Sequence, residues 1–276
     1  MNKKTTKKEG LCALTGNRGL YVKAHIIPLA VTRLDVLGER ARQTGLDVIP
    51  GWRSTSWYDD ELVTQSGEDI LKAIDSDGIN DLKKHKLIWS GWQNEWNKLP
   101  DEYISHRFSE HLAVRKLDNV SFDAIRLLYL SILWRSISSK RKEMAYVKNL
   151  STINMDLLRD MVINRNPSDY FKFPMVLNQI STRGTLHNRT PIFEERAFDD
   201  ITLGCYRIYF NGLVCSIYDT VDENIAQKFD KLVLKNNAEN LVLLNTWESS
   251  REYEEMKAMM QDGLYKETFI KNAKGK

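Results

Sequence analysis

The sequence predicts an α+β protein, in which a short hairpin and several helices precede a mostly β region with a closing helix. Three observations carry this prediction. The opening stretch "GLCALTGNRGLYVKAHIIP" (10–28) forms two short apolar segments around a Gly-Asn-Arg-Gly turn. Segment 121–142 has apolar residues at every third or fourth position. Segment 205–221 instead alternates on both sides of Asn211-Gly212, which is a strong hairpin signal.

The length and composition indicate a protein with a sizeable core. Hydrophobic residues fill 42% of the 276 positions, and the formal net charge of +3 neither demands nor excludes a nucleic-acid partner. Three cysteines are too few for a disulfide framework, and the polar N-terminus does not resemble a signal peptide. The longest apolar run, 124–134, is shorter than the roughly twenty residues that span a membrane. We therefore expect a soluble, cytoplasmic protein without a membrane segment.

The first part of the chain is expected to contain the hairpin, two helices and a loop. Residues 29–45 have helical spacing and end at Gly45, a suitable C-cap. Segment 46–65 is rich in turn-forming residues and reads as a loop or insertion. Ser66, with Asp69 three residues later, has the pattern of a capped helix start.

The later elements follow from their periodicity. Helix 121–142 can be capped by Ser121 and ends in basic residues, and helix 155–166 stops before Pro167. Segment 240–247 is a further strand candidate. The expected organisation is a disordered basic tail at 1–10, a region at 11–115 with an insertion around 46–85, a helical region at 116–180, and a β-rich C-terminal region at 181–276 with a closing helix.

The opening hairpin carries a motif that resembles the first half of HNH, or ββα-metal, nucleases. The motif consists of Cys12-x-Leu14, a short turn and "KAHIIP" (23–28). The closer resemblance is to a bacterial HNH-like group with Cys-x-Leu-Cys, Ser-His-Ile-Ile-Pro and Leu-Leu-Cys-x-x-Cys-Glu. Further patches similar to this group are "LYLSILWRSISS" (128–139), "LLRDMVINRNPSDYFKFPMVL" (157–177) and "YRIYFNGLVCSIYD" (206–219). The resemblance implies a ββα-metal fold over the start of the chain.

The zinc-binding cysteines of that group are degenerate here. The first pair corresponds to Cys12 and Thr15, and we place the second pair on "LIWSGWQ" (87–93), where Trp89 and Trp92 replace both cysteines. Since a structural zinc needs four nitrogen or sulfur ligands, we expect no structural zinc. Trp89, Trp92 and Trp96 would share one helix face. We expect Trp89 and Trp92 to pack against the hairpin near Cys12 and Leu14, the alternative being an exposed stacking platform for bases.

The resemblance implies that His25 is the general base of a nuclease, assisted by a divalent cation such as Mg²⁺ or Mn²⁺. A neutral imidazole suits the removal of a proton from water. Ala24, which precedes His25, cannot bind a metal, so Asn94 and Glu95 are the candidate metal ligands from the following helix. The alternative is that His25 is a satisfied, partly buried histidine with a structural role.

Other polar residues give weaker signals. Arg18 and Lys23 on the hairpin, and His187 and Arg189 in a basic loop, are candidate contacts to nucleic-acid phosphates. The series Glu102, His106 and Glu110 would share a helix face, either as metal ligands or as a salt-bridged stripe, and the stripe is favoured. Cys205 and Cys215 are expected to be buried thiols.

Two functional hypotheses follow from the sequence. The first is an HNH-like, metal-dependent DNA endonuclease of bacterial defence or phage-conflict type, which hydrolyses phosphodiester bonds with His25 as general base. The second is a catalytically inactive relative that serves as a DNA- or protein-binding scaffold subunit of a larger complex. The retained His-Ile-Ile-Pro favours the first, and the small net charge favours the second.

Overall fold

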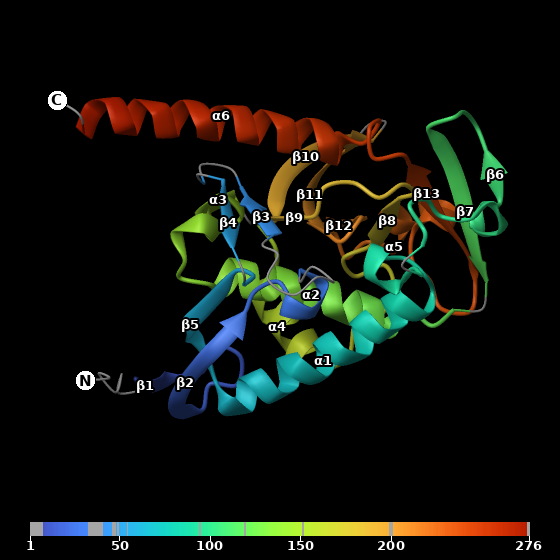
Figure 1. Ribbon diagram of the computed structural model, residues 1–276. Coiled ribbons are helices and arrows are strands. Elements are labelled where there is room, and N and C mark those ends of the chain that lie inside the picture. The colour runs from blue at the N-terminus through green and yellow to red at the C-terminus, as the bar shows by residue number, and fades with distance from the viewer. Residues whose placement is uncertain are drawn as a thin grey trace.

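The chain forms an α+β fold in which a buried central helix separates an N-terminal sheet from a larger C-terminal sheet (Figure 1). The computed structural model describes residues 8–32, 41–45, 48, 50–53, 55–93, 95–118, 120–150, 152–198 and 201–274. One hydrophobic cluster joins residues of the opening hairpin, the central helix and the C-terminal sheet. The predicted fold class is therefore confirmed.

The N-terminal sheet has the strand order β1 (Glu9–Leu11), β2 (Arg18–His25) and β5 (Tyr58–Thr64). The hairpin β1–β2 matches the prediction, with Leu11 opposite Arg18. Strand β5 pairs with β2 in antiparallel fashion although 32 residues separate them, and helix α1 (Gln65–Lys84) begins directly after β5. The predicted cap Ser66 lies inside α1, because Thr64 occupies the cap position.

The helix predicted at 29–45 is wrong for the described residues of this segment, 29–32 and 41–45. Residues Leu29–Val31 form a single 3₁₀ turn, residues 33–40 lie outside the described residues, and β3 (Ala41–Thr44) is a strand. The predicted loop at 46–65 contains the short strand β4 (Gly51–Arg53) and all of β5. Strand β3 pairs with the nearby β4 and, in parallel, with β9 (His187–Arg189), which lies far away in sequence.

Helix α2 (Asp123–Ser138) is the predicted central helix, and it is buried on nearly every side. On one side it packs against α1, and on the other Tyr129 stacks on Phe210 with ring centroids 5.2 Å apart. Ser121 does not cap it, since Phe122 holds the cap position. The shorter helices are α3 (Ala145–Leu150) and α4 (Met155–Ile163), and Asn154 caps α4 by accepting a hydrogen bond from the Leu157 N–H.

The C-terminal sheet has seven strands in the order β10-β11-β12-β8-β13-β7-β6. Their bounds are β6 (His106–Arg107), β7 (Leu112–Asp118), β8 (Met175–Ile180), β10 (Ile192–Phe198), β11 (Ile201–Phe210), β12 (Leu213–Tyr218) and β13 (Glu239–Asn245). Only the β8–β13 pair is parallel among these described strands. The predicted hairpin turn at Asn211-Gly212 is confirmed, with φ of 51° and 77°. Positive φ at both positions is what a tight two-residue hairpin requires.

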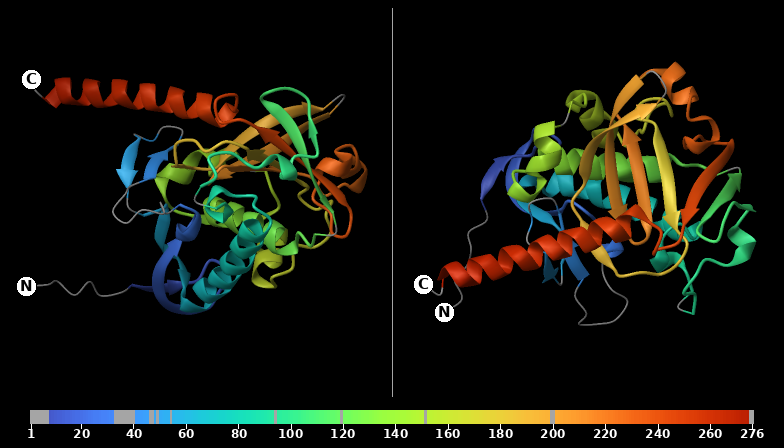
Figure 2. Two further views of the ribbon diagram at one scale, coloured as in Figure 1. Left: turned by 45° about the vertical axis from the view of Figure 1, so that its right-hand side comes forward. Right: turned by 90° about the horizontal axis from the view of Figure 1, so that it is seen from above.

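The chain ends with α5 (Glu223–Gln227) and the long helix α6 (Arg251–Lys274), the predicted closing helix. Figure 2 shows that α6 leaves the edge of the large sheet and extends away from the body of the molecule. Short 3₁₀ turns occupy Trp89–Gly91, Asp101–Tyr103, Lys142–Met144 and Asp230–Leu232. Among the described residues, none of the helices has the length and apolar character needed to cross a bilayer.

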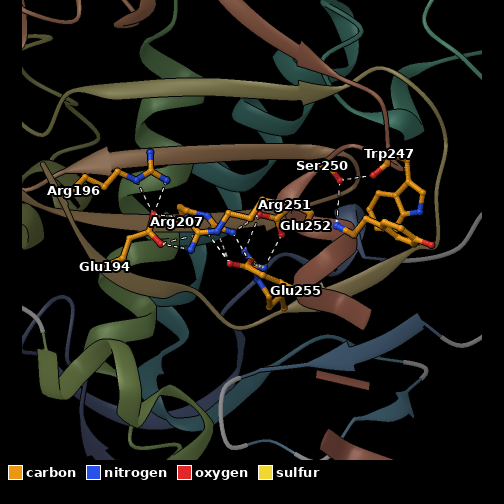
Figure 3. Close-up of polar contacts among 10 residues, drawn as sticks. Glu194, Arg196, Arg207, Trp247, Ser250, Arg251, Glu252 and Glu255 are labelled. Carbon is orange, nitrogen blue, oxygen red and sulfur yellow. Dashed lines mark hydrogen bonds and ion pairs between the residues drawn. The ribbon is translucent and has the colours of Figure 1, made fainter. Parts of the chain in front are cut away.

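A network of ion pairs fixes the start of α6 to the strands beneath it (Figure 3). Arg207 of β11 donates hydrogen bonds to Glu252 and Glu255, each with an N–O distance of 2.6 Å, and Arg189 of β9 pairs with the same two carboxylates. Glu194 of β10 accepts from Arg196, Arg207 and Arg251. Every carboxylate of this α6 network therefore faces at least one guanidinium.

Candidate active site

A pocket of about 330 Å³ lies where the end of β2 and the turn after it face helix α1. His25 enters it from β2, while Glu68, Lys72 and Asp75 enter it from the first half of α1. Their spacing along the helix brings them to one face, because residues four and seven positions apart lie nearly above one another. We call this the α1 pocket.

His25 is held at the rim of the α1 pocket by its neighbours in the sheet. It stands opposite Tyr58 across the β2–β5 ladder, and the two rings meet edge to face with centroids 6.2 Å apart. Its Nε2 lies 3.3 Å from the hydroxyl oxygen of Thr55. These contacts fix the imidazole while leaving the residue only half-buried.

Arg135 joins the helix pair to the histidine. Its side chain is 1% exposed and donates one hydrogen bond of 2.7 Å to the main-chain oxygen of His25. It also holds both carboxylate oxygens of Asp75, at 3.0 and 2.6 Å. This bidentate ion pair balances the positive charge of the buried arginine with the negative charge of Asp75. Two of the sequence patches that resemble the HNH-like group, "KAHIIP" and "LYLSILWRSISS", thus touch through this contact.

Glu68 differs from Asp75 in having no partner. It makes no hydrogen bond or ion pair with any described residue, although it is half-buried. Burial raises the pKa of its carboxyl group to about 7, and the nearby positive charges of Arg135 and Lys72 only partly oppose this. A carboxyl with a strongly shifted pKa, in a pocket beside a histidine, is a recognised sign of a functional site.

Cys12 lies in the turn between β1 and β2, at the opposite end of β2 from His25, and contacts the start of α1. It begins a tight turn in which the Thr15 N–H donates to its sulfur at 3.4 Å. Burial alone would raise the pKa of this thiol, but hydrogen bonds from Thr15 and from the main chain of Thr64 and Leu14 hold it below its usual value. A Cβ atom on Gly67 would lie only 2.6 Å from the Cys12 sulfur. Cys12, Thr15, Thr64 and Gly67 therefore converge at one place.

Trp89 and Trp92, on which we placed the second cysteine pair, belong to a different hydrophobic cluster from Cys12. The residues that do reach Cys12 from the start of α1 belong to the segment Leu62-Val63-Thr64-Gln65-Ser66-Gly67-Glu68. In this segment Thr64 and Gly67 have the spacing of a Cys-x-x-Cys pair, and Glu68 follows directly.

Trp89 and Trp92 are buried as predicted, at 2% and 5% exposed, but their surroundings are not the predicted ones. They belong to a separate cluster with Tyr209 and Trp247, and they lie on a 3₁₀ turn and the extended residue after it, not on one helix face. The Trp89 ring NH donates to the Ile180 oxygen at 3.0 Å. The tryptophans therefore support the turn of the β11–β12 hairpin and not the opening hairpin.

The candidate metal ligands from that segment do not join His25. Asn94 lies outside the described residues, and Glu95 is exposed and does not line the α1 pocket. Among the described residues no group of three His, Cys, Asp or Glu side chains could hold a metal ion. Of the two carboxylates that line the pocket, Asp75 is paired with Arg135, and Glu68 forms no ion pair with a described residue. One such carboxylate suits Mg²⁺, which keeps several waters and takes further ligands from substrate phosphates, but it does not suit a structural zinc.

The candidate phosphate contacts separate into two groups. Arg18 is exposed, and Lys23 lies with its Nζ 3.7 Å over the Tyr58 ring, next to His25. His187 and Arg189 are each 1% exposed. His187 stacks on Tyr209, and burial lowers its pKa to about 4, while Arg189 belongs to the α6 network. These two side chains are held inside the protein.

The helical stripe suggested by Glu102, His106 and Glu110 is wrong, because these residues lie on a 3₁₀ turn, on β6 and on the loop after it. Cys205 and Cys215 are buried in β11 and β12, as predicted. The sequence argument did not single out Glu68, Asp75 or Arg135 as site residues. Comparison of this chain with protein-family models, curated proteins and solved structures finds no match.

Proposed function

We propose that the α1 pocket is the centre of a metal-dependent phosphodiesterase of the HNH-like type, with DNA as its substrate. The observation that carries this proposal is the order of the elements: His25 ends one strand, β5 pairs with that strand, and α1 follows with Glu68 in the same pocket. Strand, strand and helix in this order are the elements that the resemblance implies. The cluster of Cys12, Thr15, Thr64 and Gly67 at the start of α1, which would correspond to the degenerate zinc positions, adds to the support.

The residues of the pocket suit hydrolysis of a phosphodiester bond. His25 is the general base that removes a proton from the attacking water, and the Thr55 hydroxyl fixes the direction of its ring. Glu68 would hold a divalent ion through its carboxylate oxygens, with water and the substrate phosphate as the other ligands, so that His25 serves as the base and not as a ligand. When bound, such an ion stabilises the negative charge that develops on the phosphate oxygens. A cation beside Glu68 also favours the ionised form of its carboxyl group, which burial otherwise disfavours.

A scaffold role is the second candidate function. The observation that favours it is the small set of charged donors, since Asp75 is paired with Arg135 and Glu68 is the one other carboxylate among the described pocket residues. On this alternative the α1 pocket binds DNA or a partner subunit without cleaving it.

The test compares cleavage of plasmid DNA in Mg²⁺ and in Mn²⁺ by the wild type, His25→Ala and Glu68→Gln. We expect both substitutions to lower the rate by about 10²–10⁴, the usual contribution of a general base or its equivalent. Both variants should stay folded, because Arg135 holds the main-chain oxygen of His25 and Glu68 has no partner to lose.

The matched control is His111→Ala, an exposed histidine bound to Thr246 outside the α1 pocket. It should cleave like the wild type. Equal trace activity in the wild type and His25→Ala would assign that activity to a contaminant. A folded wild type that cleaves nothing, alone or with a co-purifying partner, would favour the scaffold role.

A further inference from the structure

The α1 pocket extends along α1 from Glu68 to Lys83, between the helix and the turn that follows β2. Its lining includes Lys72, Ser76, Asn80 and Lys83, together with Pro28 and Leu29 on the opposite wall. From Glu68 to Lys83 the helix advances by roughly 22 Å at 1.5 Å per residue. The volume of about 330 Å³ is spread along this line, so the feature is a narrow groove and not a rounded cavity.

Two lysines of this groove have no acidic partner. Neither Lys72 nor Lys83 forms an ion pair with any described carboxylate, whereas many other lysines and arginines of the described chain do, including the neighbouring Arg135. Lys83 is moreover half-buried. Both lysines therefore remain available to negative charges from outside the chain.

We propose that the groove is the path of a DNA strand, with Lys72 binding the phosphate next to His25 and Lys83 binding a phosphate further along the same duplex. This inference rests on the proposed function and adds to it the path of the substrate, which runs along α1 from Lys72 to Lys83. The lysines are eleven positions apart, or roughly 16 Å, which corresponds to about five steps of a B-form strand at 3.4 Å per step. The groove thus contacts the backbone and leaves the base sequence unread.

The test measures the affinity of the full chain for a fluorescent 20-base-pair DNA duplex in EDTA, where the DNA stays uncleaved, as a function of KCl concentration. Each phosphate contact contributes about 0.9 to the slope of log affinity against log salt. We expect Lys72→Gln and Lys83→Gln each to reduce this slope by about 1 and to weaken binding by roughly tenfold at 0.1 M salt, equally for duplexes of different sequence.

The matched control is Lys84→Gln. Lys84 follows Lys83 on the same helix and carries the same charge, but it is exposed and does not line the groove. It should leave the slope unchanged. Equal effects of Lys83→Gln and Lys84→Gln would show diffuse attraction and overturn the proposal, as would a wild type that does not bind the duplex. Competition by a mononucleotide at the same concentration would also overturn it, in favour of a small-molecule pocket.

The outcomes separate this inference from the proposed function. His25→Ala and Glu68→Gln should bind the duplex as well as the wild type while failing to cleave it. Lysine effects on binding without cleavage by any variant would support the groove and refute the nuclease. Cleavage that depends on His25 but not on Lys72 or Lys83, with unchanged salt slopes, would support the nuclease and refute the groove.

Discussion

In the α6 network every carboxylate faces an arginine, whereas in the α1 pocket Glu68 and two lysines face no opposite charge within ion-pair distance among the described residues. Both clusters contain partly or fully buried ionisable groups. In the network Arg189 and Arg207 are 1–2% exposed and together hold three glutamates from α6 and β10. In the pocket only Asp75 is paired, and its partner Arg135 comes from the helix behind it.

The difference separates a polar cluster that holds the fold together from one that is available to a ligand. A buried charge is tolerated when an opposite charge and hydrogen bonds compensate its loss of water. The α6 network meets this condition internally. The pocket does not, and a substrate phosphate for the lysines and a cation for Glu68 would each supply the missing charge. Three predictions test this distinction.

The largest effect is expected from breaking the network. Arg207→Ala leaves Glu252 and Glu255 with fewer guanidinium contacts in a buried place, and we expect a loss of about 3–5 kcal/mol in the free energy of unfolding. Chemical denaturation monitored by tryptophan fluorescence measures this loss. A loss below about 1 kcal/mol would mean that the network contributes no more than surface ion pairs do.

The second prediction is a gain in the free energy of unfolding, caused by replacing Glu68. The folded-state pKa of Glu68, about 7, exceeds its ordinary value of 4.5, so the folded protein binds more protons than the unfolded chain between these pH values. The stability that the protonated carboxyl contributes is complete below pH 4.5 and is lost as the pH rises through 7. Glu68→Gln does not titrate and should therefore become more stable than the wild type at pH 8, by about 1 kcal/mol given the partial screening by solvent.

Denaturation midpoints at pH 4.5, 6 and 8 measure this dependence. The difference between Glu68→Gln and the wild type should grow with pH. A constant difference across the three pH values would show that the carboxyl titrates near its ordinary pKa, and the contrast between pocket and network would lose its main support.

The smallest effect is expected at an exposed pair. Asp77 and Arg165 lie 2.6 Å apart, with side chains 57% and 47% exposed. Asp77→Asn should change the free energy of unfolding by less than about 1 kcal/mol, since water screens both charges. The same denaturation assay provides the measurement. A loss as large as that of Arg207→Ala would show that burial does not account for the difference between the pairs.

Local pattern was sufficient for elements whose neighbours in sequence are also their neighbours in space. The helix at α2, the Asn211-Gly212 turn and the opening hairpin are of this kind. It failed at 29–45, where β3 pairs with β9 from a part of the chain about 140 residues away. Strand β3 has only four residues, so its alternating pattern is too short to be distinguished from the helical spacing of the surrounding segment.

The candidate site was predictable in part for the same reason. His25 belongs to a contiguous motif, "KAHIIP", and could be found without the fold. Its companions Glu68 and Arg135 are separated from it by 43 and 110 positions, and only the pairing of β2 with β5 and the packing of α1 on α2 bring them together. The burial of Trp89 was predictable, but its packing near Cys12 and Leu14 was wrong, because an aromatic pattern does not say which part of the core the side chain joins.

The contact from Arg135 to His25 has a consequence for protein synthesis. The histidine emerges from the ribosome early, but the residue that fixes its main chain follows 110 positions later. Helix α2 in turn packs on Phe210 of β11, so its own docking awaits the C-terminal strands. A nascent or truncated chain that carries the histidine motif but lacks β11 would therefore lack an assembled pocket, so the pocket forms only after β11 has been synthesised.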